Sequence, residues 1–385
     1  MAPPQPPPVP IPLFPPAPNV NLVTDQKLQD ALLAVTKGLT NKDYGLTIVD
    51  TGKAAAGTSN FPSASVNGDV EHYAASMLKV ACMYAAFALR DLAQRFNMAR
   101  KPTDPDDFFR KIKDELDPLI EVCCPMITGH APSVRLPKWR DMFAATGNSK
   151  ALNVHFAHDY ATSMVKMIVP SKNEDAGRCI RGVGYAYLNG LMLKHGFFDD
   201  APKARKGIWL AGDYGGSEVV TISCDNDVDT KQGATSNTMA RLGLAIFVQR
   251  ILPGTSSGQM VELLKMSAEG SDSSYFTRTE IFTDPAQKAL THKQVTHGKI
   301  GLGELKSKRK VFSDLNAIND PIGQGGDFTV CYTNIDYNPH SIQEVLQVIR
   351  DTMGIYQGGA AAPPAAAAQA APPARAIAPA AQRNP

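Results

Sequence analysis

Strand-like segments occur near both ends of this chain, and a long helix-favouring stretch separates them. Residues 45–50, Gly-Leu-Thr-Ile-Val-Asp, predict a strand that closes in a turn at Thr51-Gly52. Further strand-like runs follow much later, around residues 299–305, 311–318 and 328–334. Since the stretch between them, roughly 105–270, is mostly helical with loops, we expect one sheet assembled from both ends and a helical region inserted into it. A cleft where two such lobes meet is a common ligand site.

Two amphipathic helices are expected beside this sheet. Residues 22–39 favour a helix, and near the end Ile342, Val345, Leu346 and Ile349 recur at i, i+3, i+4 and i+7. These terminal helices are expected to cover one face of an antiparallel sheet built from about 20–70 and 295–356. An all-helical lobe is expected over about 71–294. The predicted fold class is α/β of the α+β type.

The two ends of the chain have the composition of disordered segments. Residues 1–19 form a proline-rich arm and residues 357–385 an Ala/Pro tail, and both lack the apolar content that packing requires. A domain over 20–356 is therefore expected between them. The arm has neither the basic start nor the apolar core of a secretory signal, and no apolar run reaches the roughly 18 residues that cross a bilayer.

Composition excludes several classes of function. The 385 residues are 43% hydrophobic and 20% charged, which is typical of a globular protein. The net charge of +2 gives no reason to expect binding to nucleic acid or to an anionic membrane. No CxxC pair and no HExxH motif occur, so we expect neither a metal site nor a cofactor, and we interpret most of the six cysteines as buried thiols.

One helical segment carries a serine and a lysine in an otherwise apolar setting. From Ala74 to Leu89 the only polar side chains are Ser76, Lys79 and Tyr84, which predicts a buried helix. Residues three apart share a helix face, so Ser76 and Lys79 are neighbours. Burial lowers the pKa of a lysine, and a neutral lysine can act as the base that a serine nucleophile needs. A capping serine followed by a lysine that extends to solvent is the structural alternative.

Two later segments complete a set of three motifs. Ser171-Lys172-Asn173 precedes a helical segment, and Lys299-Ile300-Gly301 lies in a strand-like run. Together with Ser76-x-x-Lys79, they resemble the Ser-x-x-Lys, Ser-Asp-Asn and Lys-Thr-Gly signature of class A β-lactamases and penicillin-binding proteins. The resemblance extends over roughly residues 22–356. Thr235-Ser236-Asn237 is a competing candidate for the second motif.

The resemblance implies a role for each motif residue. Ser76 would be the nucleophile, Lys79 its base and Ser171 a proton relay. Asn173 would bind the substrate amide and the lysine, Lys299 would attract the substrate carboxylate, and Gly301 would let the substrate backbone approach the strand. The main-chain N–H groups of Ser76 and Leu302 would form the oxyanion hole. The substrate would be a small-molecule or peptide-like acyl compound, a β-lactam, peptide or ester; the oligomeric state stays open.

The sequence departs from the family pattern at three points. Ile300 replaces the hydroxyl residue that contacts the substrate carboxylate, which suggests a substrate without that carboxylate. Residues 207–214 contain no equivalent of the glutamate that activates the deacylating water, and Asp213 and Glu218 are the acidic residues nearby. We therefore expect slow deacylation. The third departure is that residues 1–19 do not resemble a secretory signal, whereas proteins of this family are usually exported.

Two other classes of function compete with a β-lactamase-like hydrolase. The altered third motif is also compatible with a non-catalytic penicillin-recognising sensor or binding module. Gly254-Thr255-Ser256-Ser257-Gly258 matches the GxSxG elbow of α/β-hydrolases, with Ser256 as its nucleophile. An elbow requires a strand before it and a helix after it, whereas Pro253 interrupts a segment that favours a helix.

Overall fold

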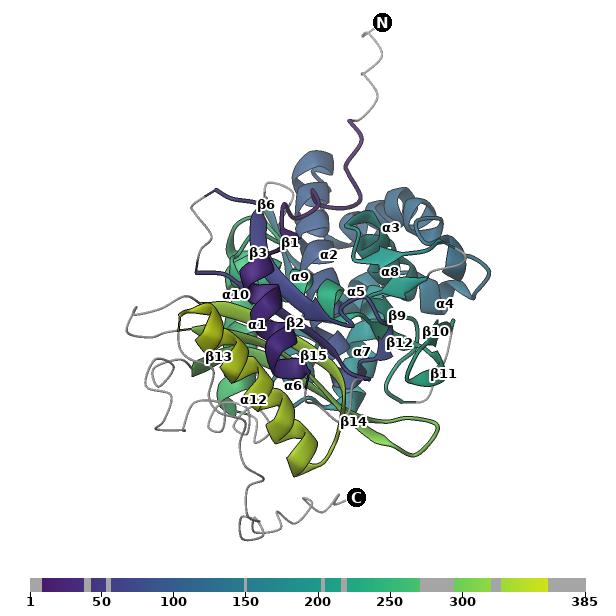
Figure 1. The fold of residues 1–385 in the computed structure, drawn as a ribbon. Coiled ribbons are helices and arrows are strands. Elements are labelled where there is room, and N and C mark those ends of the chain that lie inside the picture. The colour runs from purple at the N-terminus through teal and green to yellow at the C-terminus, as the bar shows by residue number, and fades with distance from the viewer. Residues whose placement is uncertain are drawn as a thin grey trace, which may run out of the picture.

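The computed structural model describes residues 9–37, 43–52, 57–148, 151–201, 205–215, 220–270, 294–319 and 327–358. Its centre is a six-stranded sheet with the strand order β1-β3-β2-β15-β14-β13, and only the pair β1–β3 is parallel. As expected, the two ends of the chain supply this sheet (Figure 1). The strands are β1 (Asn21–Thr24), β2 (Gly45–Asp50), β3 (Asn60–Val66), β13 (Gln294–Glu304), β14 (Lys310–Asn319) and β15 (Phe328–Asp336).

Two terminal helices, α1 (Gln26–Thr36) and α12 (Pro339–Tyr356), pack against each other and cover one face of the sheet (Figure 1). The predicted helix over residues 22–39 is wrong at its start, because residues 21–24 pair with β3 as a strand. The helix starts only after Asp25, whose carboxylate accepts a hydrogen bond from the Leu28 N–H. Alternate strand residues fill the core under these helices, as period-two alternation requires.

The other face of the sheet meets α9 (Ser236–Phe247) and α10 (Thr255–Gly270). Beyond them lies the helical lobe, whose core is continuous with this face. Its central helix α2 is buried on nearly all sides, as its apolar sequence predicts. The lobe consists of η1 (Ala75–Leu78), α2 (Lys79–Arg100), α3 (Pro105–Glu121), η2 (Pro125–Ile127), α4 (Pro132–Arg135), α5 (Trp139–Met142), α6 (His158–Ile168), α7 (Asn173–Val183) and α8 (Tyr185–Lys194).

Short strand pairs accompany the helices of the lobe and of the region beside η1. The pair β5–β6 forms a hairpin-like ribbon beside α2, and β4, β12 and β9 form a small sheet next to η1. Their bounds are β4 (His72–Tyr73), β5 (Phe143–Asn148), β6 (Ala151–Phe156), β7 (Phe198–Asp199), β8 (Lys206–Gly207), β9 (Trp209–Leu210), β10 (Ile222–Cys224), β11 (Asp227–Thr230) and β12 (Gln232–Ala234). None of the helices among the described residues is long and apolar enough to cross a membrane.

The proline-rich arm is ordered where the structure describes it, contrary to the expectation of disorder for residues 1–19. Phe14 packs on Tyr187 with 5.3 Å between ring centroids, and Ile11 and Leu13 also contact the core of the lobe. His195 Nε2 donates a hydrogen bond of 2.9 Å to the Pro15 carbonyl. A few apolar side chains between prolines are enough, because proline leaves little backbone entropy to lose on docking. Residues 1–8 lie outside the described residues, as does all of the predicted tail after Gly358.

The prediction for the cysteines is confirmed. All six are free thiols, and all are buried except Cys123, which is half-buried.

Candidate active site

Ser76 lies in the short 3₁₀ turn η1 that leads into α2. Its neighbours Ala75 and Met77 are buried, whereas Ser76 itself is half-buried. Ala75 has φ +50°, a left-handed conformation that costs energy in a residue with a Cβ atom. No hydrogen bond involves Ser76 Oγ within the part of the chain that the structure describes. The alternative reading of this serine as a helix cap is therefore not supported, and its half-buried hydroxyl has no partner among the described residues.

Lys79 is the first residue of α2 and is fully buried. Its Nζ donates to three acceptors: the Ser171 carbonyl at 2.6 Å, Ser171 Oγ at 3.2 Å and Asn173 Oδ1 at 2.9 Å. The ammonium therefore does not extend to solvent, which rejects the structural alternative for this residue. In the largely apolar first half of α2, the Lys79 amine therefore lies among polar acceptors.

Ser171 and Asn173 reach Lys79 because of the turn that precedes α7. Ser171 has φ +57°, so the chain reverses there and directs both its carbonyl and its hydroxyl towards Lys79. The N-cap of α7 is Lys172, which makes no side-chain capping bond. Ser171 is therefore not a helix cap, and its unusual backbone conformation is used to hold the lysine.

Lys299 brings the sheet into the same cluster. It lies on β13, is 2% exposed, and its Nζ donates to Ser171 Oγ at 2.8 Å and to the Ile300 carbonyl at 3.2 Å. The two lysines thus meet at one serine hydroxyl. Since this oxygen can accept from both, its own proton is free to be donated to a third group.

Burial changes the acid–base properties of both lysines. The pKa of Lys79 is lowered from 10.5 to about 7, mainly by burial and secondly by the positive charge of Lys299, while the Cys82 thiol acts in the opposite direction. Burial also lowers the pKa of Lys299 to about 8, with the Asp314 carboxylate acting in the opposite direction. A lysine amine of this kind is a base near neutral pH.

The close packing of neighbouring backbone segments requires a glycine at position 301. A Cβ atom at this position would lie 2.5 Å from the Ala74 carbonyl oxygen and 2.9 Å from the Met77 nitrogen. This glycine therefore allows β13 to approach the turn that carries Ser76. The sequence had suggested that it makes room for a substrate backbone, whereas the close approach seen here is between two segments of the protein.

The expectation for Ile300 is wrong. Its side chain is 6% exposed and belongs to the core under α1 and α12, on the face of the sheet opposite Lys299. Side chains alternate along a strand, so a residue next to Lys299 cannot share its side. Ile300 therefore does not occupy the space beside the lysines, and it says nothing about the substrate. Leu302 follows on the same strand and is 42% exposed.

The two competing motifs lie elsewhere. Thr235 caps α9, and Ser236 Oγ and Asn237 Oδ1 both bond to Thr47 Oγ1 at 2.8 Å. Ser256 lies at the start of α10, buried, with its hydroxyl held between Arg90 and Asp91. Neither segment contacts Lys79, and the residue before the elbow is not in a strand.

Tyr214 is a neighbour of Lys79 that sequence reasoning missed. Its ring centroid lies 4.6 Å from Lys79 Nζ, and its hydroxyl donates 2.9 Å to the Ala75 carbonyl. Asp213, one residue earlier, is buried and ion-paired with Arg181, so it does not face Ser76 as a base. Glu218 lies outside the described residues. No sequence signal distinguishes Tyr214 from other loop aromatics, because its role depends on the fold of the loop.

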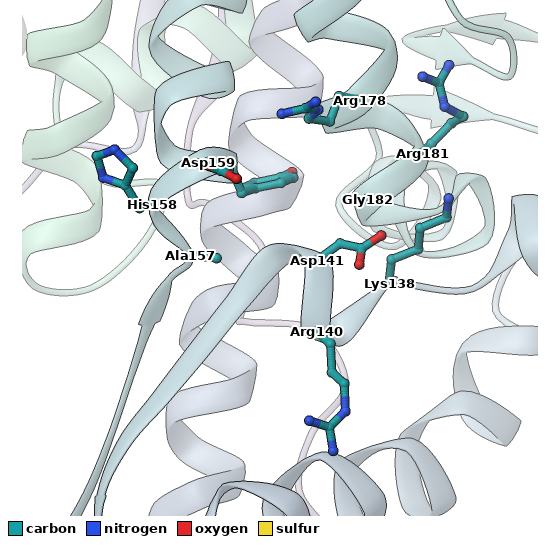
Figure 2. A pocket seen from close by; sticks show the side chains of 10 residues that line it. Lys138, Arg140, Asp141, Ala157, His158, Asp159, Arg178, Arg181 and Gly182 are labelled. Carbon is teal, nitrogen blue, oxygen red and sulfur yellow. The ribbon is translucent and has the colours of Figure 1, made fainter.

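A pocket on the helical lobe does not offer a comparable arrangement. It has a volume of about 660 Å³ and is lined by basic side chains that include Lys138, Arg178 and Arg181. Figure 2 shows that Arg140 and Arg181 point away from each other, and both are already paired, with Asp106 and Asp213 respectively. In the portion of the chain covered by the structure, no group of His, Cys, Asp and Glu is placed to hold a metal ion.

Comparison with known proteins gives a likeness in structure alone. No family model and no curated protein sequence matches the chain. Among solved structures, a variant of the TLA-1 extended-spectrum β-lactamase is 12% identical, with 85% of this chain and 98% of that chain covered and a TM-score of 0.50. The structure of PBP-A is 16% identical, covering 89% and 98%, with a TM-score of 0.47. A β-lactamase from Sphaerobacter thermophilus DSM 20745 is 15% identical, covering 86% and 97%, with a TM-score of 0.46.

The predicted fold class is thereby confirmed. The antiparallel sheet, its two terminal helices and the inserted helical lobe form a mixed α/β fold of the β-lactamase and DD-peptidase type.

Proposed function

We propose that this chain is a serine hydrolase of the β-lactamase and penicillin-binding type, with residues 20–356 as its catalytic domain. The observation that carries the proposal is the buried Lys79. Its amine lies one helical turn from Ser76 and is joined through Ser171 Oγ to a second buried lysine, Lys299. Burying two lysine amines side by side gives a protein no stability, so we attribute this arrangement to catalysis.

The first step is the attack of Ser76 Oγ on a carbonyl carbon. With a pKa of about 7, roughly half of the Lys79 amines are neutral at neutral pH and can accept a proton. Lys79 takes the Ser76 hydroxyl proton as the new O–C bond forms. The N–H groups of Ser76 and Leu302 are proposed to stabilise the oxyanion. Since β13 is an edge strand, one row of its N–H groups has no partner in the sheet.

The second step is the departure of the leaving group. Ser171 Oγ accepts hydrogen bonds from both lysines, so its own proton can pass to the leaving nitrogen or oxygen while Lys79 returns the proton taken from Ser76. The carbonyl–heteroatom bond breaks and Ser76 retains the acyl group. Asn173 holds Lys79 in place through Oδ1. Amides, β-lactams and esters all satisfy these requirements.

Hydrolysis of the acyl-enzyme is expected to be slow. A water molecule needs a base to attack the ester. Asp213 is bound to Arg181 and is buried, so it is not available for this role. A β-lactam is thus expected to act more as an inhibitor than as a substrate, and nitrocefin turnover well below the roughly 10 per second of a typical enzyme checks this.

Intact-protein mass spectrometry tests the proposal directly. The chain is incubated with a penicillin and, separately, with a fluorophosphonate, and the modified peptide is located by digestion. We expect one adduct, on the peptide that contains Ser76. Ser76→Ala should abolish it, and Lys79→Met should slow its formation by a factor of about 100 or more, as loss of a general base does.

Ser133→Ala is the matched control, because Ser133 is an exposed serine on α4. It should be labelled like the original protein. Unchanged labelling of Ser76→Ala, or no labelling of the original protein by either reagent, contradicts the proposed function and favours a non-catalytic binding module.

A further inference from the structure

Tyr214 bridges the two segments that carry the reacting groups. Its ring lies over Lys79 Nζ at 4.6 Å, and its hydroxyl donates to the carbonyl of Ala75, the residue before Ser76. One side chain therefore spans the space between the base and the backbone of the nucleophile. Burial raises the pKa of Tyr214 well above its usual range, so the hydroxyl stays protonated and acts as a donor.

The turn that carries Tyr214 is fixed by the residue before it. Asp213 Oδ1 accepts from the Gly215 N–H at 2.9 Å, and Oδ2 pairs with Arg181. Arg181 lies on α7, the helix that begins at Asn173. The same helix therefore binds Lys79 at its first residue and the Tyr214 turn about two turns later, which fixes the position of the ring relative to the lysine.

A hydrolytic water would have to stand beside both Ser76 and Lys79. Tyr214 occupies space next to both, because its ring covers Nζ and its hydroxyl reaches the main chain beside the serine. The three hydrogen-bond acceptors of Nζ come from a different segment, Ser171 and Asn173. The ring of Tyr214 and the polar groups of Ser171 and Asn173 together surround the Lys79 amine.

We infer that Tyr214 is a positioning residue that shields Lys79 from water and so both keeps the amine reactive and delays hydrolysis of the acyl-enzyme. This inference rests on the proposed function for its effect on hydrolysis, but the shielding itself is a property of the folded chain.

Two opposing effects of the ring on Lys79 can be compared. The π face attracts an ammonium group, whereas exclusion of water disfavours the charge. Because burial is the largest cause of the low pKa of Lys79, loss of the ring should act mainly by admitting water. The pKa of Lys79 should then rise towards 10.5, and less of the amine is neutral at pH 7.

The first experiment measures the amine without any acyl transfer. Wild-type protein, Tyr214→Phe and Tyr214→Ala receive a short pulse of acetic anhydride between pH 6 and 10, and acetylation of Lys79 is followed by peptide mass spectrometry. We expect strong protection in the wild type and in Tyr214→Phe. In Tyr214→Ala, labelling should be at least about tenfold faster at high pH, with its midpoint at higher pH because the amine is solvated.

The second experiment follows Ser76. Acylation by a fluorescent penicillin is measured against pH, and loss of the label is timed after removal of excess reagent. Tyr214→Ala should move the acidic limb of acylation to higher pH and shorten the lifetime of the label about tenfold or more. Tyr214→Phe keeps the ring and should change neither by more than about threefold. Tyr337→Ala, which truncates an exposed tyrosine, is the control for loss of an aromatic side chain.

The outcomes separate the two proposals. A purely structural role would lower the melting temperature of Tyr214→Ala without moving the pH midpoint of either reaction. If Lys79 stays protected in a folded Tyr214→Ala protein, the inference is wrong, whatever Ser76 does. If the wild type shows no label on Ser76, the proposed function fails, while the acetylation of Lys79 still decides whether Tyr214 shields it.

Discussion

Lys79 and Lys299 donate hydrogen bonds to the same atom, Ser171 Oγ, at 3.2 and 2.8 Å. One lysine comes from the central helix of the lobe and the other from the edge strand of the sheet. Each is therefore close enough to affect the charge of the other, and the hydroxyl between them connects the two halves of the fold.

Next to burial, the charge of Lys299 should help to lower the pH at which Lys79 becomes a base. Lys299→Met removes a positive charge that lowers the pKa of Lys79, so that pKa should rise and the acidic limb of Ser76 acylation should move to higher pH. At pH 7 the acylation rate should fall, with partial recovery above pH 8. Acylation rates between pH 5 and 10 provide the measurement. Lys308→Met, whose side chain is 83% exposed, is the control and should not shift the acidic limb of the acylation profile. If Lys299→Met does not shift this limb either, the two lysines are not electrostatically coupled.

The buried amine of Lys79 should reduce the stability of the protein. Its pKa is about 7 in the folded state and near 10.5 when unfolded, so the unfolded chain binds more protons between these values. The destabilisation is complete below about pH 7 and is relieved as pH rises towards 10.5. We expect Lys79→Met to be about 1–4 kcal/mol more stable than wild type at pH 7. Urea unfolding at pH 7, 8 and 9 should show this difference shrinking, and a constant or widening difference would contradict the prediction.

Gly301 should tolerate no side chain. In Gly301→Ala the new methyl group meets backbone atoms of Ala74 and Met77, so β13 and η1 must separate. This overpacking should cost about 1–3 kcal/mol, and acylation of Ser76 should slow because the turn moves. Thermal unfolding and labelling rates measure the two effects. Gly258→Ala is the control: its methyl group points into open space on α10, and it should be neutral or slightly stabilising.

Ile300 should affect stability and not substrate choice. Ile300→Thr places a hydroxyl in the apolar core under α1 and α12, which should cost about 1–3 kcal/mol. Ile300→Val, which removes one methylene group, should cost about 0.5–1.5 kcal/mol. The ratio of acylation rates for a penicillin and a neutral p-nitrophenyl ester should be the same in both variants and in wild type. A ratio that favours the penicillin in Ile300→Thr alone would place residue 300 beside the substrate after all.

The proline-rich arm should contribute to stability through Phe14. Phe14→Ala removes the contact with Tyr187, and we expect a loss of about 1–3 kcal/mol for a partly buried aromatic ring. Deletion of residues 1–19 should lower the melting temperature by several degrees, whereas Val9→Ala, at a position 79% exposed, should not. Calorimetry of the three proteins provides the measurement. Deletion of the Ala/Pro tail, residues 357–385, is expected to leave the melting temperature almost unchanged.

Local sequence patterns predicted the strands β2, β13, β14 and β15, the buried helix α2 and the last helix, but neither β1 nor β3. These elements are long and regular, so their periodicity is informative. The start of α1 was missed because a short strand and a capping aspartate look like the beginning of a longer amphipathic run. The arm was misjudged because composition counts apolar residues and does not show whether a matching surface such as that around Tyr187 exists.

The resemblance of three motifs to the β-lactamase and penicillin-binding signature implied that Lys79, Ser171, Asn173 and Lys299 lie together, and the structure brings them into contact. Their catalytic roles stay predictions. The interpretation of Ile300 failed for a reason present in the sequence, because adjacent residues of a strand face opposite sides. Tyr214 could not have been predicted, since its place over Lys79 depends on an ion pair between Asp213 and a helix that begins far from it in the chain.

The pairing of β2 with β15 determines when the site can exist during synthesis. Val49 pairs with Thr329, so the sheet closes only after its last strands have left the ribosome. Until then the apolar surface of the helical lobe that packs on the sheet is uncovered. Contacts between residues so far apart in the sequence form slowly, and the apolar surface stays exposed in the meantime. Lys299 arrives in the same late segment. A nascent chain therefore carries Ser76 and Lys79 long before it carries the strand that completes their surroundings, and reactivity should appear only with the final closure of the sheet.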